Sequence, residues 1–258
     1  MKKSALVLVA SLGASLVPTF AFADDAASPL TFNIGAVSDY RYRGISQTKL
    51  HPAVQGGADY AQGPFYVGTW LSTIDWVKDT GKAVGVDSGD APVEWDLYGG
   101  TKGDIIKDTL SYDVGVLAYV YLGEKFHNIG LSNPDTGEFY GALTYGVFTG
   151  KVSISATPLF GMPKSKGSQY YDLSANFDLG SGFTLTPHIG YQNISGSVAK
   201  AAGASYSDYS ITLGKDFGKG LSASLAVIAT DADKNFYVTS TGKFTGRTGV
   251  VAGVKYAF

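Results

Sequence analysis

Charged side chains recur at every second position in several segments of this 258-residue chain. The first of these segments sets Asp39, Arg41 and Arg43 against Tyr40 and Tyr42. Residues two apart lie on the same face of an extended strand, so the charged groups of each segment share one side. Such a row can line a polar channel, or its members can pair and brace an interior. The residues expected to line the inner face are Asp39, Arg41, Arg43, Asp59, Glu94, Asp96, Asp113, Glu138, Asp172, His188, Asp208 and Lys255.

Acids dominate this inner face. The same alternation adds Asp178, Asp216 and Lys151, which gives ten carboxylates against four basic groups. An excess of carboxylates raises the local concentration of cations and repels anions. We therefore expect an open lumen to prefer cations or neutral solutes. For Arg41 and Arg43 two roles stay open, a charged constriction and an internal salt-bridge network, and the two can coexist.

Catalytic chemistry is poorly supported by the residue pattern. A nucleophilic serine would need a histidine beside it. His188 lies on a polar face and Ser174 in the preceding strand, but no serine has the sequence of a nucleophile elbow. Asp231 and Asp233 lack the glycine and bidentate glutamate of a calcium loop. There is no cysteine, and the three histidines have no ligand spacing. We therefore predict no catalytic, cofactor-binding or metal-ligating residue, and a protein that is not an enzyme.

Strands with one apolar and one polar face must position these side chains. The alternation predicts about twelve strands, at residues 30–43, 50–61, 64–76, 91–101, 108–122, 136–147, 150–160, 169–179, 182–194, 206–217, 220–230 and 247–258. A tilted strand crosses a bilayer with about 9–11 residues, which suits these lengths. The pattern predicts an all-β fold, a single transmembrane antiparallel up-and-down β-barrel.

The connections support a barrel over a soluble sandwich, which would show the same alternation. Tight turns alternate with long polar loops, apart from a short link at 44–49 and a longer one at 102–107. Outer-membrane barrels combine short turns at one end, long loops at the other and an even strand number. Aromatic girdles on the outer face are also typical of them. The aromatic residues expected there are Tyr40, Tyr42, Tyr66, Trp76, Tyr171, Phe183, Tyr191, Phe217, Tyr256 and Phe258.

The N-terminus has the pattern of a cleaved secretory signal peptide. Lys2 and Lys3 precede an apolar stretch, and Ala21-Phe22-Ala23 is a small-x-small cleavage site. This predicts a signal peptide at 1–23 and a mature barrel at 24–258. Loss of the two lysines changes the formal charge from -2 to -4, with 18 basic and 22 acidic residues remaining. A weakly acidic chain does not predict a nucleic-acid partner.

The last ten residues form one alternating strand that ends on an aromatic side chain. This ending resembles the closing strand of bacterial outer-membrane barrels, whose terminal aromatic is recognised by the barrel-assembly machinery. Gly253, Tyr256 and Phe258 fit the family pattern, whereas Val251 stands where a polar residue is usual. We expect this strand to pair with residues 30–43 and to close the barrel, with Lys255 inside.

A longer stretch carries a family resemblance. Residues 38–48 read Ser-Asp-Tyr-Arg-Tyr-Arg-Gly-Ile-Ser-Gln-Thr, followed by Pro-Ala-Val-Gln-Gly-Gly-Ala-Asp-Tyr at 52–60 and Phe-Tyr-Val-Gly-Thr-Trp-Leu-Ser at 65–72. Together with Glu-Trp-Asp-Leu-Tyr-Gly-Gly at 94–100, they resemble the proteobacterial TorF-type porin family. The resemblance spans most of the mature chain. It implies little about mechanism, because the porin label of that family is itself an inference from its barrel-like character.

The function that the sequence favours is passive diffusion of small solutes across the bacterial outer membrane. Twelve strands lie between the ~8 of a barrel filled by side chains and the ~16 of a water-filled pore. A small selective pore and a lumen blocked by side chains or a folded-in loop are therefore both open. The alternative is an outer-membrane barrel without a transport role, structural or receptor, or a lipid-modifying enzyme. Expected partners are outer-membrane lipid, the assembly machinery and a small solute, with no cofactor; the oligomeric state is left open.

Overall fold

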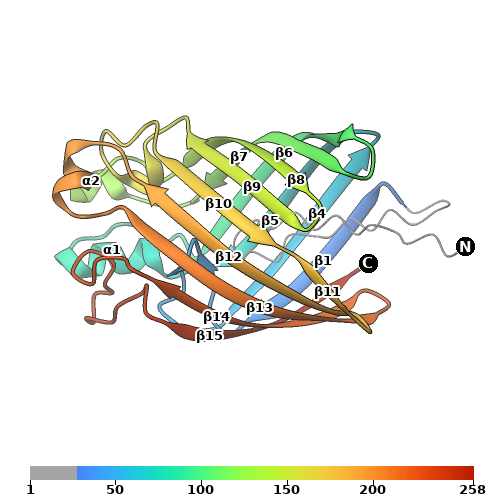
Figure 1. Cartoon of the computed structure of the whole chain (residues 1–258). Coiled ribbons are helices and arrows are strands. Elements are labelled where there is room, and N and C mark those ends of the chain that lie inside the picture. Colours follow the sequence, from blue (N-terminus) through green and yellow to red (C-terminus); the bar gives the residue numbers. More distant parts are fainter. Residues whose placement is uncertain (1–27) are drawn as a thin grey trace, which may run out of the picture.

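Strands that are neighbours in the chain are paired around a closed wall in the computed structural model, which describes residues 28–258. The sheet has thirteen strands, but β10 (Gln169–Ala175) and β11 (Phe177–Gly180) are two halves of one crossing, so twelve crossings form the wall. The others are β1 (Leu30–Val37), β4 (Ala53–Gln62), β5 (Phe65–Thr73), β6 (Val93–Ile106), β7 (Leu110–Val120), β8 (Thr136–Tyr145), β9 (Phe148–Ser155), β12 (Phe183–Asn193), β13 (Tyr206–Gly218), β14 (Leu221–Thr230) and β15 (Gly249–Ala257). The predicted twelve-stranded antiparallel barrel is confirmed (Figure 1).

The last strand closes the wall against the first. β1 and β15 are antiparallel, with Gly35 opposite Lys255. Phe258 continues the pairing through two backbone hydrogen bonds with Phe32, of 2.8 and 2.9 Å, and the two rings stack at 5.9 Å. The first and last strands of the chain therefore pair with each other and do not present open sheet edges. The predicted partner of the C-terminal strand is therefore confirmed; recognition of its aromatic end by an assembly machinery stays a prediction.

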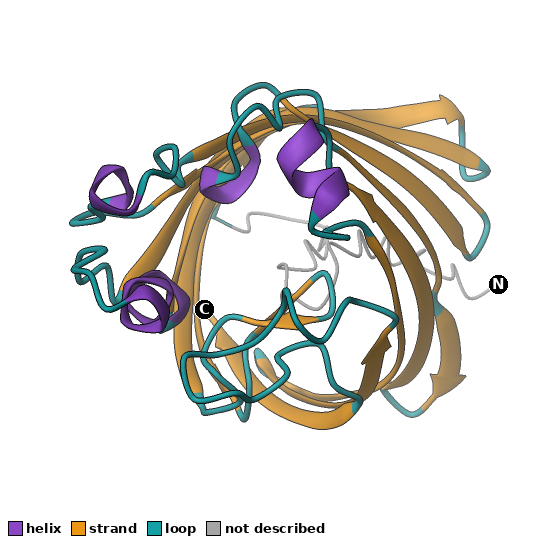
Figure 2. Cartoon of the chain, turned by 90° about the vertical axis from the view of Figure 1, so that its left-hand side faces the viewer, coloured by secondary structure: helices purple, strands orange, loops and turns teal. Residues whose placement is uncertain are grey.

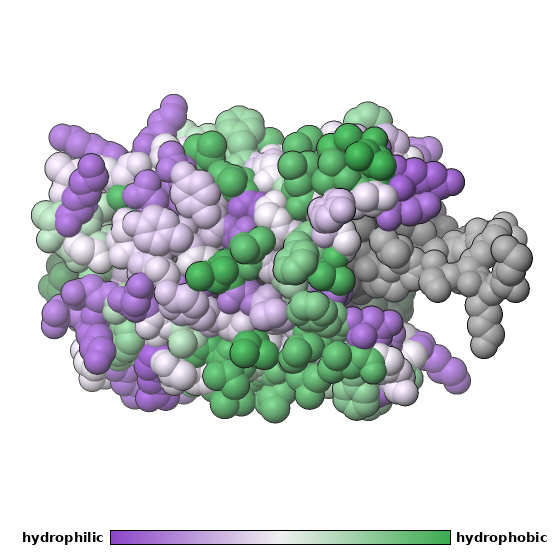
Figure 3. Space-filling model, in the orientation of Figure 1, coloured by the Kyte–Doolittle hydropathy of each residue, from purple (hydrophilic) through white to green (hydrophobic). Residues whose placement is uncertain are grey.

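The wall is apolar outside and polar inside, because side chains alternate along each strand. On β1 and β4, Ile34 and Val54 are 54% and 58% exposed, whereas Asn33, Gln55 and Asp59 on the same strands are buried. Exposed large hydrophobic side chains recur on the outer face of the other wall strands, and apolar side chains gather over the middle of the molecule in Figure 3. This distribution is the inverse of a soluble protein and suits an apolar solvent.

The two ends of the barrel differ. One end carries tight turns, and the other carries long loops with the helices α1 (Trp76–Val84) and α2 (Ser197–Ala201) and the short 3-10 helices η1 (Phe126–Ile129) and η2 (Leu159–Gly161) (Figures 1 and 2). We call these the turn end and the loop end. The longer link predicted at 102–107 is wrong, since β6 continues to Ile106 and leaves a short turn. Among residues 28–258, no helix is long and apolar enough to span a membrane.

The first predicted strand, 30–43, is too long. β1 ends at Val37, and residues 38–52, which we call the inserted segment, turn into the barrel. They contain a small hairpin of β2 (Arg41–Tyr42) and β3 (Ile45–Ser46), seen inside the ring of wall strands in Figure 2. Arg43 and Gly44 form its tip with φ of 46° and 79°. The hairpin is itself extended, so the period of two continues across the break and conceals it.

The predicted signal peptide at 1–23 lies outside the described residues.

Candidate functional site

The inserted segment fills the lumen at the loop end. Tyr40 is 1% exposed, and its hydroxyl donates a hydrogen bond of 2.5 Å to Oε1 of Glu94 on β6. Tyr121 donates to the other carboxylate oxygen at 2.6 Å, so Glu94 is held from both sides. The Tyr40 ring also packs edge-on against Trp70 of β5, at 5.4 Å between centroids. A wall carboxylate therefore anchors the start of the inserted segment.

Arg41 ties the hairpin to itself and to the last loop. Its Nε lies 2.5 Å from Oδ2 of Asp39, and one terminal nitrogen donates to the carbonyl oxygen of Gly44 at 2.9 Å. The same nitrogen reaches the carbonyl oxygens of Thr245 and Arg247, at 2.9 and 3.1 Å. The Arg41 side chain thus pairs within the segment and does not face an open channel.

Arg43, at the hairpin tip, contacts the opposite wall. One terminal nitrogen donates to both carboxylate oxygens of Glu138 on β8, at 3.0 and 2.7 Å. The other donates to Oε1 of Gln192 on β12 at 2.6 Å. The guanidinium lies 4.3 Å from the ring centre of Tyr170 and 4.7 Å from that of Tyr42. Arg43 and Glu138 are both nearly fully buried, so this ion pair spans the lumen without direct contact with bulk water.

A second polar cluster lies beside the Arg43 site. His188 Nε2 lies 2.7 Å from Oδ2 of Asp172 and 3.2 Å from the Tyr170 hydroxyl. Its Nδ1 lies 3.6 Å from Oδ1 of Asp208, whose carboxylate also accepts from Tyr170. Ser174 is the cross-strand neighbour of His188, and the ring nitrogens of His188 also lie within 3.6 Å of two carboxylates and a phenol. The two carboxylates, the phenol and the imidazole can together hold a proton or a cation.

Tyrosine hydroxyls donate to two further wall carboxylates, a role that the sequence analysis missed. Tyr98 donates to Oδ1 of Asp59, and Tyr66 donates to Oδ1 of Asp113 at 2.5 Å. Among the described residues, Oδ1 of the buried Asp96 has no hydrogen-bond partner. The inward position of Tyr98 could have been predicted, because Tyr98 is an even number of residues from Glu94 and Asp96 on the same strand.

The twelve residues expected to line the inner face are all buried or half-buried. The buried ones are Asp39, Arg41, Arg43, Asp59, Glu94, Asp96, Glu138, Asp172, Asp208 and Lys255, and the half-buried ones are Asp113 and His188. Three of them, Asp39, Arg41 and Arg43, belong to the inserted segment and not to the wall. Asp178 and Asp216 are exposed, since they lie close to the ends of their strands.

The predicted outer girdle is wrong for four aromatic residues. Tyr40 and Tyr42 lie in the inserted segment and Tyr66 points to Asp113 inside, while Trp76 in α1 packs edge-on against Tyr121 and Phe126. The six predicted girdle residues that are exposed are Tyr171, Phe183, Tyr191, Phe217, Tyr256 and Phe258. For Tyr40 and Tyr42 the error has the same origin as the long first strand, because both residues continue the parity of β1.

The lumen is less filled toward the turn end. Near the loop end the inward residues of β12 and β13 are buried, among them Gln192 and Asp208. Further along the same strands the inward hydroxyl residues are half-exposed; they are Thr184, Thr186, Ser210 and Thr212. The barrel is therefore packed where the inserted segment lies and more accessible on the turn side.

At the loop end, segments that lie beyond the wall strands also contact one another. Asp79 of α1 accepts from the backbone nitrogen and hydroxyl of Ser240, at 2.8 and 2.6 Å, and pairs with Lys49 of the inserted segment at 3.2 Å. Burial raises the pKa of Asp79, but the hydrogen bonds from Ser240 and the ion pair with Lys49 outweigh it, so its pKa falls below the ordinary value. Asp79 thus links α1, the last loop and the inserted segment.

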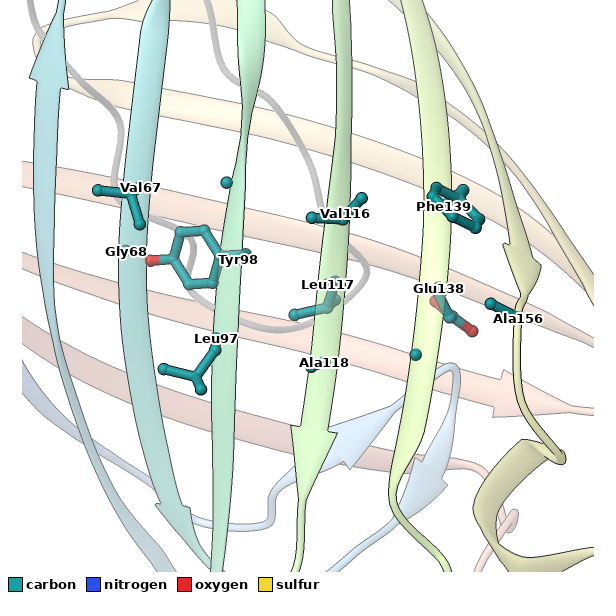
Figure 4. Close-up of a pocket in the computed structure, with 12 residues that line it drawn as sticks. Val67, Gly68, Leu97, Tyr98, Val116, Leu117, Ala118, Glu138, Phe139 and Ala156 are labelled. Atoms are coloured by element: carbon teal, nitrogen blue, oxygen red, sulfur yellow. The ribbon is translucent and has the colours of Figure 1, made fainter.

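A groove of about 500 Å³ crosses the outer face over β5 to β8 and Ala156, the residue that follows β9. Val67, Leu97, Val116 and Phe139 stand around it (Figure 4). Glu138 belongs to the same wall, but its carboxylate is buried and bonded to Arg43 inside. The groove lies in the apolar outer surface and is separate from the polar site around Arg43.

A family model described as "Bacterial protein of unknown function (Gcw_chp)" matches residues 23–258. The chain belongs to this family. No curated protein matches it.

Three solved structures are similar to this Gcw_chp protein, and the first of them has a TM-score that indicates a shared fold. A NanC porin structure in a rhombohedral crystal form matches with a TM-score of 0.51 and 9% identity, over 89% of this chain and 98% of that one. The OccD1 (OprD) Y282R/D307H structure matches with a TM-score of 0.43 and 13% identity, and this chain spans 66% of its length. LpxR from Salmonella typhimurium matches with a TM-score of 0.44 and 11% identity, over 88% and 99% of the two chains.

Proposed function

We propose that this Gcw_chp protein is an outer-membrane channel for small solutes, and that the inserted segment closes its lumen in the structure described above. The observation that carries the proposal is a closed barrel with an apolar outer face and a charged inner face. In such a wall the backbone groups of neighbouring strands hydrogen-bond to each other, as lipid requires, and the interior is polar. The porin name of the NanC neighbour supports the same function.

We also propose that the open lumen prefers cations or neutral solutes. The buried or half-buried acids of the wall strands are Asp59, Glu94, Asp96, Asp113, Glu138, Asp172 and Asp208, and the corresponding lysines are Lys102, Lys151 and Lys255. Both arginines of the lumen belong to the inserted segment, so departure of that segment would leave the acids more strongly in excess. Carboxylates in a confined polar space attract cations.

A second candidate is a barrel without a transport role. The filled loop end favours it, because Arg43, Glu138 and Gln192 form a bonded bridge across the lumen. The two candidates differ in what happens when the bridge is broken. A channel then conducts, whereas a structural barrel stays closed or loses its fold.

Reconstitution into planar bilayers tests the proposal. We expect low conductance for the native protein and a higher, cation-selective conductance for the Arg43→Ala variant. Lys125→Ala is the matched control, since Lys125 pairs with Asp87 on the exposed surface and not in the lumen. Conductance that stays at the bilayer background in the native protein and in a folded Arg43→Ala variant would reject the channel. Fractionation of native cells checks the location, and recovery outside the outer membrane would contradict it.

A further inference from the structure

The wall around Arg43 has the features of a ligand site occupied by a side chain of the protein itself. Glu138, Tyr170 and Gln192 come from three different wall strands and meet at one guanidinium. Each of the three is buried. They stay in place when the inserted segment moves, because their strands are held by the pairing of the barrel.

The contacts match the shape and charge of a guanidinium group. Glu138 offers two oxygens, at 3.0 and 2.7 Å, to one nitrogen, and Gln192 offers a third oxygen at 2.6 Å to another. The face of the Tyr170 ring lies 4.3 Å from the central carbon. Acceptors for two different guanidinium nitrogens, with an aromatic face against the central carbon, favour an extended, delocalised cation over a compact ammonium.

The surroundings of the pocket keep it anionic when Arg43 leaves. Asp208 lies beside Tyr170, which donates to it at 3.0 and 3.2 Å, and Asp172 lies next along β10. Lys151 and His188 are the cationic or protonatable groups nearby. Together with Glu138, three carboxylates thus face one lysine and one histidine. An empty pocket would attract a cation from the lumen.

We propose that Glu138, Tyr170 and Gln192 form a binding site for solutes that carry a guanidinium group, and that Arg43 occupies this site in the closed lumen. A solute of this class competes with Arg43 and favours release of the inserted segment. The binding site stands on the contacts alone, whereas the opening by solute rests on the proposed channel function.

Calorimetry on the detergent-solubilised full chain tests the site without any need for conductance. The Arg43→Ala variant empties the pocket, and methylguanidinium is the probe. We expect binding to Arg43→Ala that weakens at least about tenfold in Arg43→Ala/Glu138→Gln, since hydrogen bonds to charged groups contribute on that order. Methylammonium, which has the same charge but no planar guanidinium group, should bind more weakly. Equal binding of the two cations, or no loss with Glu138→Gln, would overturn the proposal.

A second experiment uses the native protein and therefore does not depend on the folding of a variant. L-arginine and L-citrulline have similar size, but citrulline carries a neutral urea in place of the guanidinium. In planar bilayers, L-arginine should raise the conductance of the native chain severalfold more than L-citrulline does. Equal responses to both solutes would contradict opening by competition. If calorimetry succeeds while no variant conducts, the site stands and the channel function fails.

Discussion

Glu138→Gln should release the inserted segment from the lumen while the barrel stays folded. The change keeps the size of the side chain but removes the charge that Arg43 faces at 2.7 and 3.0 Å. Arg43 is then a buried cation with amide acceptors only. Breaking a buried ion pair by removal of one partner costs about 3–5 kcal/mol.

The barrel can relieve that cost locally. The inserted segment is joined to the wall at its two ends, and its departure takes Arg43 to water without breaking any pairing of the wall strands. We therefore expect the lost stability to shift the equilibrium between the docked and undocked inserted segment. The free energy of global unfolding should not change. A change of about 3 kcal/mol corresponds to roughly a hundredfold rise in the undocked population.

Limited trypsin digestion measures that population. Arg41 and Arg43 are 3% and 5% exposed in the docked segment, so cleavage requires undocking. When docking is fast, the cleavage rate follows the population of the undocked form. We expect cleavage after these arginines to accelerate by up to about a hundredfold in Glu138→Gln. Lys125→Ala should cleave at the native rate, and an unchanged rate in a folded Glu138→Gln protein would refute the reasoning.

Three further changes have defined outcomes. Deletion of Phe258 should impair membrane assembly more than any loop substitution does, because it removes the two backbone hydrogen bonds to Phe32 and the terminal aromatic; normal insertion in a fractionation assay would contradict the closing role. Gly190→Ala should destabilise the barrel by about 1–3 kcal/mol in denaturant unfolding, since its added carbon would lie 2.1 Å from the Tyr170 hydroxyl; a variant as stable as the native protein would refute the close packing. Because the pKa of Asp79 is lowered in the folded state, its contribution to the loop end is complete above the ordinary carboxyl pKa of about 3.9 and is lost as pH falls through the lower folded value. Hydrogen exchange of the 231–248 loop should therefore lose protection in acid in the native protein, while Asp79→Asn should lack protection at both pH values; identical acid profiles would contradict this link.

The barrel could be predicted from the sequence because its signals are repeated in many strands. Alternation, turn length and the aromatic end each indicate the same closed antiparallel wall, and the pairing of β1 with β15 follows from the even strand number. Alternation depends on local geometry alone, because side chains two residues apart lie on the same face of an extended strand.

The inserted segment could not be predicted because its local geometry is the same as that of the wall. Asp39, Arg41 and Arg43 continue the parity of β1, so the pattern assigns them to the inner face of a strand. Arg43 is positioned by Glu138 and Gln192, and Arg41 by the carbonyl oxygen of Thr245, all of them more than ninety residues away in the chain. A folded-in loop was one of two open possibilities, and no feature of residues 38–52 alone selects it.

The inward tyrosines were missed for a different reason. Aromatic residues suit the outer girdle as well as the interior, so residue type alone misplaced Tyr66. Its parity with Ser72, and that of Tyr98 with Glu94, were better indicators than residue type. In a polar lumen a tyrosine can donate to a carboxylate, as Tyr66 does to Asp113.

The central claim is a cation-preferring channel that the inserted segment closes, and single-channel conductance under a salt gradient tests it most directly. The native chain is compared with a variant in which residues 39–49 are replaced by a short Gly/Ser linker. We predict a larger conductance in the variant and a reversal potential of the sign that marks cation preference. Equal background conductance in both folded proteins, or a reversal potential of the opposite sign, would contradict the account.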